Sequence, residues 1–202
     1  MEKTKISSDS EAVTRIIRFR KSIYADSYTG ENLPDEVLKE ILINATWAPT
    51  HKMTEPWRFI VLSGSQLRKY GDFMADYYKH LYEDIPDAQK KAAKYNYLKE
   101  YPLNAACMIG VILSKSRSVD IPEWEELAAV SCAVQNMAIS ATSYNLGSYW
   151  ATGGSAVEYV RTFGLEDHEQ SLGLFFIGYP DTPALSVTKR RTSIDKKVSW
   201  FI

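Results

Sequence analysis

The chain of 202 residues carries 24 basic and 25 acidic side chains, so its formal net charge is −1. A chain this close to neutral gives no electrostatic case for nucleic acid or for an anionic membrane as a partner. No run approaches the ~18 apolar residues of a membrane span, and the N-terminus leads into no apolar signal region. We therefore expect a cytoplasmic protein. Its length suits a single core, which predicts one domain over residues 1–202.

Cysteine and histidine usage does not favour a metal site. Cys107 and Cys132 both lie in apolar runs, where we expect them to pack in the core. The three histidines His51, His80 and His168 are far apart, and no Cys-x-x-Cys or His-x-x-x-His spacing occurs. The ten glycines form neither a G-x-G-x-x-G turn nor a P-loop, so a nucleotide-like cofactor would need another kind of site.

The first predicted helix runs from Val13 to Phe19, with apolar residues along one side. It leads into Arg20, Lys21 and Ser22, two cations followed by a hydroxyl, which can together bind an anion through charge-assisted hydrogen bonds. Taken alone, such a triplet is usually solvated surface.

A second predicted helix begins at Pro34 and ends near Trp47, because Pro49 disfavours helical geometry in the residue before it. A buried strand over 59–62 follows. The polar loop between them holds His51 and is stiffened by prolines, which suits a ligand site. On composition alone, a plain connection between the helix and the strand is the somewhat better interpretation.

The segment 66–104 contains seven tyrosines among many lysines. We predict two helices here, over 66–83 and 87–99. Tyrosine rings and hydroxyls can cover an aromatic substrate, or they can line a half-buried helical face, and the sequence does not choose between these interpretations.

An uninterrupted apolar run over 105–113 predicts a central strand. The longest predicted helix, 123–145, is apolar nearly all round, which is typical of a core or a subunit interface. Gly147 suits the left-handed position that ends such a helix.

The next stretch contains the pair Gly153 and Gly154, which permits close backbone approach to a flat ring. Ser155 is expected to cap a helix over 156–163, and a strand is expected over 172–177. Gly-rich turns are common, so this stretch alone predicts no function.

Several motifs, in this order along the chain, resemble the FMN-dependent nitroreductase family, and its short-chain branch in particular. The strongest is the stretch from Ala48-Pro49 to Pro56-Trp57, which looks like the family's Ala-Pro-x-x-x-x-x-x-Pro-Trp signature. Gln135-Asn136-Met137 followed by Asn145-Leu146-Gly147 is similar to the family's central helix, and 188–193 resembles its basic C-terminal segment. The resemblance covers nearly the whole chain and is weakest over 66–104, the region that varies most in the family and forms a helical lid.

This resemblance implies a set of FMN-binding residues and no catalytic side chain. Lys21 stands where the family has a second arginine, and it keeps the charge without the planar fork. Close relatives carry a basic residue where this chain has Trp47, so one polar contact to the cofactor is absent there. The expected cofactor residues are Arg20, Lys21, Ser22, Trp47, His51, Trp150, Ala151, Thr152 and Gly153, with Arg190 or Arg191 as the phosphate ligand.

The implied fold is α+β, a mostly antiparallel sheet flanked by helices and assembled as an intertwined homodimer with FMN at each of two subunit interfaces. The apolar terminus at 200–202 is expected to pack against the second subunit. The implied reaction moves a hydride from NAD(P)H through FMN to a small electron-poor acceptor such as a nitroaromatic or quinone. The alternatives are a dehalogenase or flavin-cleaving member of the same superfamily, a non-catalytic flavin-binding protein, and a purely structural protein.

Overall fold

The computed structural model describes residues 7–181 and 191–202 of the chain. Its helices and strands follow the order that the sequence predicts, with one added strand. The helices are α1 (Ser8–Phe19), α2 (Asp35–Thr46), α3 (Ser65–Tyr77), α4 (Ala88–Glu100), α5 (Glu123–Ser143) and α6 (Gly154–Arg161). The strands are β1 (Trp57–Leu62), β2 (Cys107–Ser114), β3 (Gly147–Ala151) and β4 (Glu169–Gly178).

The four strands form one sheet in the order β1-β2-β4-β3, and every neighbouring pair is antiparallel. The central strands β2 and β4 are the two long apolar runs, and β2 is buried along nearly its whole length. Runs without a polar side suit strands that are covered on both faces. The predicted α+β class with a mostly antiparallel sheet is confirmed.

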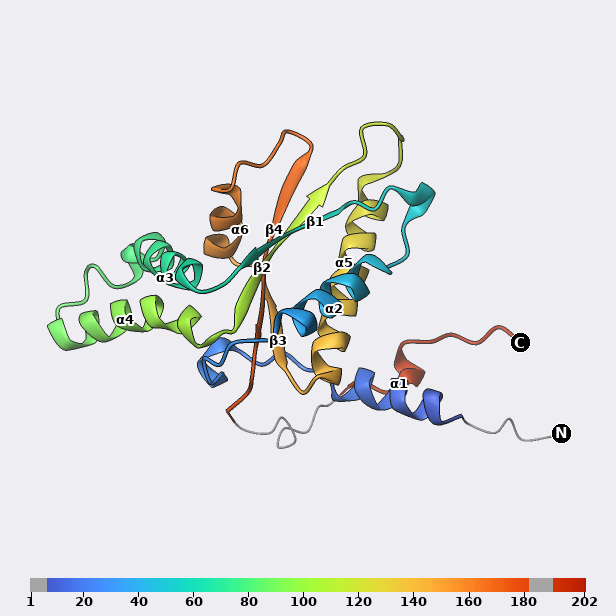
Figure 1. Cartoon of the computed structure of the whole chain (residues 1–202), viewed down its shortest axis with the longest axis horizontal. Helices are drawn as coiled ribbons and strands as arrows, with labels where there is room; N and C mark the ends of the chain where they lie inside the picture. The colour runs from blue at the N-terminus through green and yellow to red at the C-terminus, as the bar shows by residue number, and fades with distance from the viewer. Residues whose placement is uncertain (1–6, 182–190) are drawn as a thin grey trace.

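Helices cover both faces of the sheet (Figure 1). On one face α2 and α5 pack against Ile109, Val111 and Phe175, and on the other α3 and α6 pack against Met108 and Ile112. Successive β2 side chains enter opposite clusters because side chains alternate along a strand. Fully burying an aliphatic or aromatic side chain of this size contributes roughly 1.5–3 kcal/mol, so the two clusters are the main source of stability.

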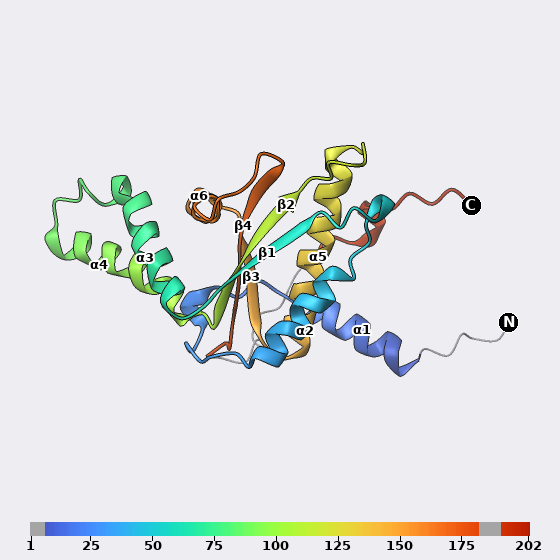
Figure 2. The same cartoon turned by 45° about the horizontal axis from the view of Figure 1, so that its top comes forward.

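Helices α3 and α4 form an arm that projects from one end of the sheet, and the two views in Figures 1 and 2 agree on this placement. The arm corresponds to the predicted helices 66–83 and 87–99, but α3 ends earlier, at Tyr77, and a short 3₁₀ turn at Lys79–Leu81 follows. The side chain of Asp87 caps α4 by accepting hydrogen bonds from the main-chain N–H groups of Gln89 and Lys90.

Three local predictions are wrong. Asn145, not Gly147, takes the left-handed conformation after α5, with φ of 59°. Gly147 instead begins β3, where a Cβ would lie 2.6 Å from the ring of Tyr28, so close packing explains the glycine. Ser155 lies inside α6 and is buried, while Gly153 occupies the capping position. Cys132 is exposed, whereas Cys107 is buried as expected.

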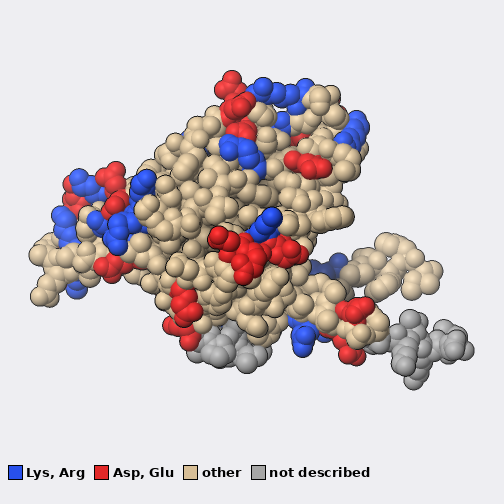
Figure 3. Space-filling model, viewed as in Figure 1, with Lys and Arg blue, Asp and Glu red and all other residues tan. Residues whose placement is uncertain are grey.

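Helix α5 buries one side and leaves apolar side chains on the other. Trp124 is 68 % exposed and Leu127 is 39 % exposed, and the C-terminal Phe201 is 96 % exposed. In the face shown in Figure 3, charged side chains gather at the α3–α4 arm, near the upper edge and in a mostly acidic group in the lower middle, and much of the remaining surface is uncharged. Large exposed apolar side chains such as those of α5 and the C-terminus are typical of an interaction surface. Within the described ranges, no helix is both long enough and apolar enough to cross a membrane.

Candidate cofactor site

Arginines from the two ends of the chain line a single cavity. Helix α1 ends at Phe19, and Arg20 closes it by donating its main-chain N–H to the carbonyl of Ile16 at 2.9 Å. Arg18 and Arg20 then line a cavity of about 430 Å³ together with Ile17 and Arg191. The structure thus brings together Arg20 and Arg191, which the sequence predicted as ligands of one phosphate. Arg190 lies outside the described residues.

Arg18 and Ile17 line the cavity although neither was predicted as a cofactor residue, and Arg18 is the charged one of the two. Its position two residues before Arg20, in the last turn of α1, was a usable signal, because a cation there also faces the negative end of the helix dipole. Guanidinium groups present planar forks of N–H donors that match phosphate oxygens. Among the described residues, three such groups and one apolar side chain line this cavity, which therefore fits the phosphate of a mononucleotide.

The residues after Arg20 join this cavity to the sheet. Lys21 is half-buried and Ser22 is exposed, and neither belongs to the described lining of the cavity. The main chain at Ser22 forms a bridge with Ser148, and the N–H of Ile23 donates to the Ser148 carbonyl at 3.1 Å. The cavity therefore lies close to the start of β3.

Strand β3 is an edge of the sheet and carries the next group of predicted residues. The indole N–H of Trp150 donates to the Leu172 carbonyl at 2.9 Å, and the ring packs with the cluster beneath α2 and α5. Ala151 is half-buried, whereas Thr152 and Gly153 are exposed and lead into α6. Because the indole is turned inward, the main chain after Trp150 is the part that can meet a ligand.

The loop from Ala48 to Pro56 is anchored by burial at both ends and held by Thr50. The Thr50 hydroxyl accepts the Glu55 N–H at 3.0 Å. Lys52, Met53 and Glu55 have φ of 49°, 55° and 44°, a region that residues other than glycine rarely adopt. Such conformations each cost of order 1–3 kcal/mol and cluster at functional sites. These conformations mark the loop as a candidate functional segment, and the stiffness expected from its prolines stays a prediction.

His51 lies at the outer side of this loop, and its Nδ1 pairs with a carboxylate oxygen of Glu125 in the first turn of α5. A second cavity, of about 380 Å³, lies here. Its lining consists of Pro49, Thr50, His51, Trp124, Glu125, Ala128, Ala129 and Cys132. Trp47, just before the loop, is 81 % exposed.

Within one chain, His51 and the arginine cavity lie at opposite ends of α5. Glu125 marks the N-terminal end, and Ser148, which bridges to Ser22, follows the C-terminal end (Figure 1). A helix of 21 residues is about 30 Å long at 1.5 Å per residue. A mononucleotide cannot bridge that distance, so one chain does not bring all the predicted residues to one ligand.

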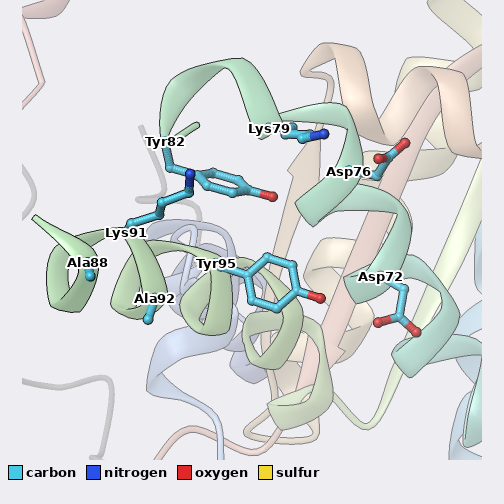
Figure 4. A pocket seen from close by; sticks show the side chains of 8 residues that line it. All are labelled: Asp72, Asp76, Lys79, Tyr82, Ala88, Lys91, Ala92 and Tyr95. Atoms are coloured by element: carbon cyan, nitrogen blue, oxygen red, sulfur yellow. The ribbon is translucent and has the colours of Figure 1, made fainter. Parts of the chain in front are cut away.

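A third cavity, of about 540 Å³, lies between α3 and α4 (Figure 4). Its charged side chains are largely paired with groups of the arm itself. Asp72 pairs with Lys99 at 2.8 Å, Lys79 pairs with Glu83 at 3.5 Å, and Lys91 donates to the Glu83 carbonyl at 2.7 Å. None of the predicted cofactor residues in the described part of the chain lines this cavity.

The family model for the nitroreductase family matches residues 17–179. A Bacillus subtilis protein named "Putative NAD(P)H nitroreductase YfhC" is 30% identical over 183 residues, which is 89% of each chain. Two crystal structures share the fold. The nitroreductase-like family protein from Bacillus cereus has a TM-score of 0.75 at 25% identity and 98% coverage of both chains. The FMN-dependent nitroreductase NfnB from Mycobacterium smegmatis, in complex with NADPH, has a TM-score of 0.72 at 16% identity, with 96% and 100% coverage. The chain therefore belongs to the nitroreductase family.

Proposed function

We propose that the protein is an FMN-dependent oxidoreductase that passes electrons from NAD(P)H to small electron-poor acceptors such as nitroaromatics or quinones. The observation that carries the proposal is the cavity shared by Arg18, Arg20 and Arg191, since a phosphate is the ligand that such a site suits. Family membership and the relatives' names point to the same chemistry.

In this proposal Arg20 and Arg191 hold the FMN phosphate, with Arg18 beside them and Lys21 contributing long-range positive charge. The adjoining edge strand β3 then runs along the ring, where Ala151, Thr152 and Gly153 offer main-chain groups and leave room for a flat ligand. When bound, FMN supplies hydride transfer in two steps, from NAD(P)H and then to the acceptor. The protein supplies orientation and cationic surroundings, so no side chain has to act as acid or base.

The second half of the site comes from another copy of the chain. His51 and its loop are too far from the arginines of the same chain, and the exposed apolar residues of α5 and the C-terminus require cover. A homodimer in which each loop reaches the partner's arginine cavity satisfies both conditions. The interface would be large and hydrophobic, as is typical of obligate dimers.

The α3–α4 arm is the substrate-side lid of this single domain. It projects from the sheet next to α6 (Figures 1 and 2). The first residues of α6 directly follow Ala151–Gly153, which we call the ring-binding stretch. An element on that side can cover an acceptor without touching the phosphate.

Anaerobic spectroscopy of the purified protein with FMN tests this function. NADPH or NADH should bleach the bound flavin band, and 4-nitrobenzoate or a quinone should restore it. Because one face of the ring serves donor and acceptor in turn, turnover should be ping-pong, with parallel double-reciprocal plots. A bound flavin that NAD(P)H does not reduce would indicate a binding protein. Reduction without transfer to these acceptors would favour the dehalogenating or flavin-cleaving alternative, which product analysis then identifies.

A further inference from the structure

The seven tyrosines of the arm differ in what their hydroxyl groups contact. Five have a polar partner: Tyr70 and Tyr78 contact the Ser155 hydroxyl at 3.1 and 3.3 Å, Tyr82 donates to the Ala75 carbonyl at 2.7 Å, Tyr101 donates to Tyr149 at 2.8 Å, and Tyr95 bonds with Lys99. The hydroxyls of Tyr77 and Tyr97 have no hydrogen-bond partner among the described residues. These two groups are therefore the ones open to a ligand.

Of these two hydroxyls, that of Tyr77 lies at the ring-binding stretch and that of Tyr97 does not. Tyr77 is the last residue of α3, and a Cβ added to Gly154 would collide with its hydroxyl oxygen. Tyr97 is on α4, where its ring lies beside Lys94 and Tyr101 instead. The glycine at 154 is thus what allows the Tyr77 hydroxyl to sit directly over the turn that follows β3.

The ring of Tyr77 is held in place from two sides. It stacks on Phe73 with centroids 6.1 Å apart and meets Tyr78 edge-on at 5.0 Å. The buried Ser155 hydroxyl, through its contacts with Tyr70 and Tyr78, ties this end of α3 to α6. Tyr77 is 38 % exposed as a residue, and its hydroxyl oxygen lies against the turn at Gly154.

We infer that Tyr77 selects the acceptor: its hydroxyl donates a hydrogen bond to an exocyclic oxygen of a flat aromatic acceptor lying on the flavin ring. The inference rests on the proposed function, because it needs the ring to lie along Ala151–Gly153. The class of ligand follows from the geometry. A hydroxyl donor held over the turn should bind a planar molecule with an oxygen in its plane, such as a nitro or quinone oxygen, more tightly than an apolar molecule of equal size.

Binding to the oxidised FMN-loaded protein, without NAD(P)H, tests this without turnover. The flavin absorbance is followed while nitrobenzene or the similarly shaped but apolar toluene is added to the wild type, Tyr77→Phe and Tyr97→Phe. Loss of one hydrogen bond should raise the Kd of Tyr77→Phe for nitrobenzene by about three- to tenfold. Its Kd for toluene should stay within twofold, and Tyr97→Phe should match the wild type for both.

Three results would overturn the inference: no change in Tyr77→Phe, an equal loss for both ligands, or an equal loss in Tyr97→Phe. Absence of any nitrobenzene binding to the wild type would do so as well. FMN affinity is measured for each variant and should not change, which separates a local effect from a damaged fold. Failure of the proposed function would show itself differently, as a wild-type flavin that NAD(P)H does not reduce.

Discussion

Arg20 and Arg191 line the same cavity, although one ends the first helix and the other lies eleven residues from the end of the 202-residue chain. Neither position alone would identify an anion site, because isolated surface arginines are common. Their convergence, with Arg18 beside them, concentrates positive charge at one point next to the edge strand β3.

Replacing Arg20 should therefore weaken FMN binding. A charge-assisted hydrogen bond contributes about 1.5–3 kcal/mol, so Arg20→Ala should raise the Kd for FMN by roughly ten- to a hundredfold. Titration of FMN into the apoprotein, followed by quenching of flavin fluorescence, measures this. Arg15→Ala is the matched control, since Arg15 is an exposed cation of the same helix outside the cavity lining. An unchanged affinity in Arg20→Ala would remove Arg20 from the site.

The ion pair between Arg58 and Glu169 should make stability depend on pH in the acid range. Arg58 donates to both carboxylate oxygens, at 2.5 and 2.6 Å, and these hydrogen bonds lower the pKa of Glu169. A lowered folded-state pKa stabilises the protein above the ordinary glutamate pKa of about 4.3, and the contribution is lost as pH falls through the folded-state value. Because Arg58 is partly exposed, we expect Glu169→Gln to cost about 1–2 kcal/mol at pH 7.

Urea unfolding at a series of pH values checks this. The difference between wild type and Glu169→Gln should be constant from pH 7 to about pH 5 and should shrink below about pH 4. Glu158→Gln removes an exposed i,i+3 pair with Arg161 and should change the free energy of unfolding by less than about 0.5 kcal/mol. A pH-independent difference for Glu169→Gln would show that packing, not charge, is responsible.

Deleting residues 198–202 should weaken the dimer and release FMN together. Trp200, Phe201 and Ile202 are 73 %, 96 % and 113 % exposed in the single chain, which suits a segment covered by a partner. A ligand that binds only the assembled state stabilises it by about 2.7 kcal/mol at a hundredfold excess over Kd. Sedimentation read in the protein and flavin absorbance bands measures both effects, with Ser199→Ala as the control. A truncated protein that remains dimeric and FMN-loaded would contradict the coupling.

The positions of most helices and strands could be predicted from the sequence, because the spacing of apolar residues along a helix or a strand follows from which side is buried. The apolar runs of β2 and β4 and the single apolar side of α2 correspond to what the structure buries. Arg20 and Arg191 do line one cavity, and only resemblance to a family linked two such distant positions; their role as cofactor ligands stays a prediction.

The errors arose where contacts between distant segments decide the outcome. Strand β3 reads as a Gly-rich turn, and it becomes a strand because β4 pairs with it. Gly147 fits a helix end by local rules, but it is needed because Tyr28 packs against it. Ser155 resembles a helix cap, yet it binds two tyrosines of an arm more than seventy residues away. The partners of these residues could not be identified from local sequence.

We propose that each FMN site combines residues of two chains, because Arg20 and His51 lie at opposite ends of α5 within one chain. A mixed dimer of Arg20→Ala and His51→Ala chains tests it. If the site combines Arg20 of one subunit with His51 of the other, each single-variant homodimer has two damaged sites. The mixed dimer then has one site with both substitutions and one fully intact site.

The most direct measurement is FMN titration into mixed dimers purified through two different affinity tags. We expect the mixed dimer to bind one FMN with wild-type affinity, while both homodimers bind FMN only weakly. If both residues served the same site from one chain, the mixed dimer would contain no intact site. The absence of any wild-type-affinity FMN in the mixed dimer would therefore contradict the two-chain site.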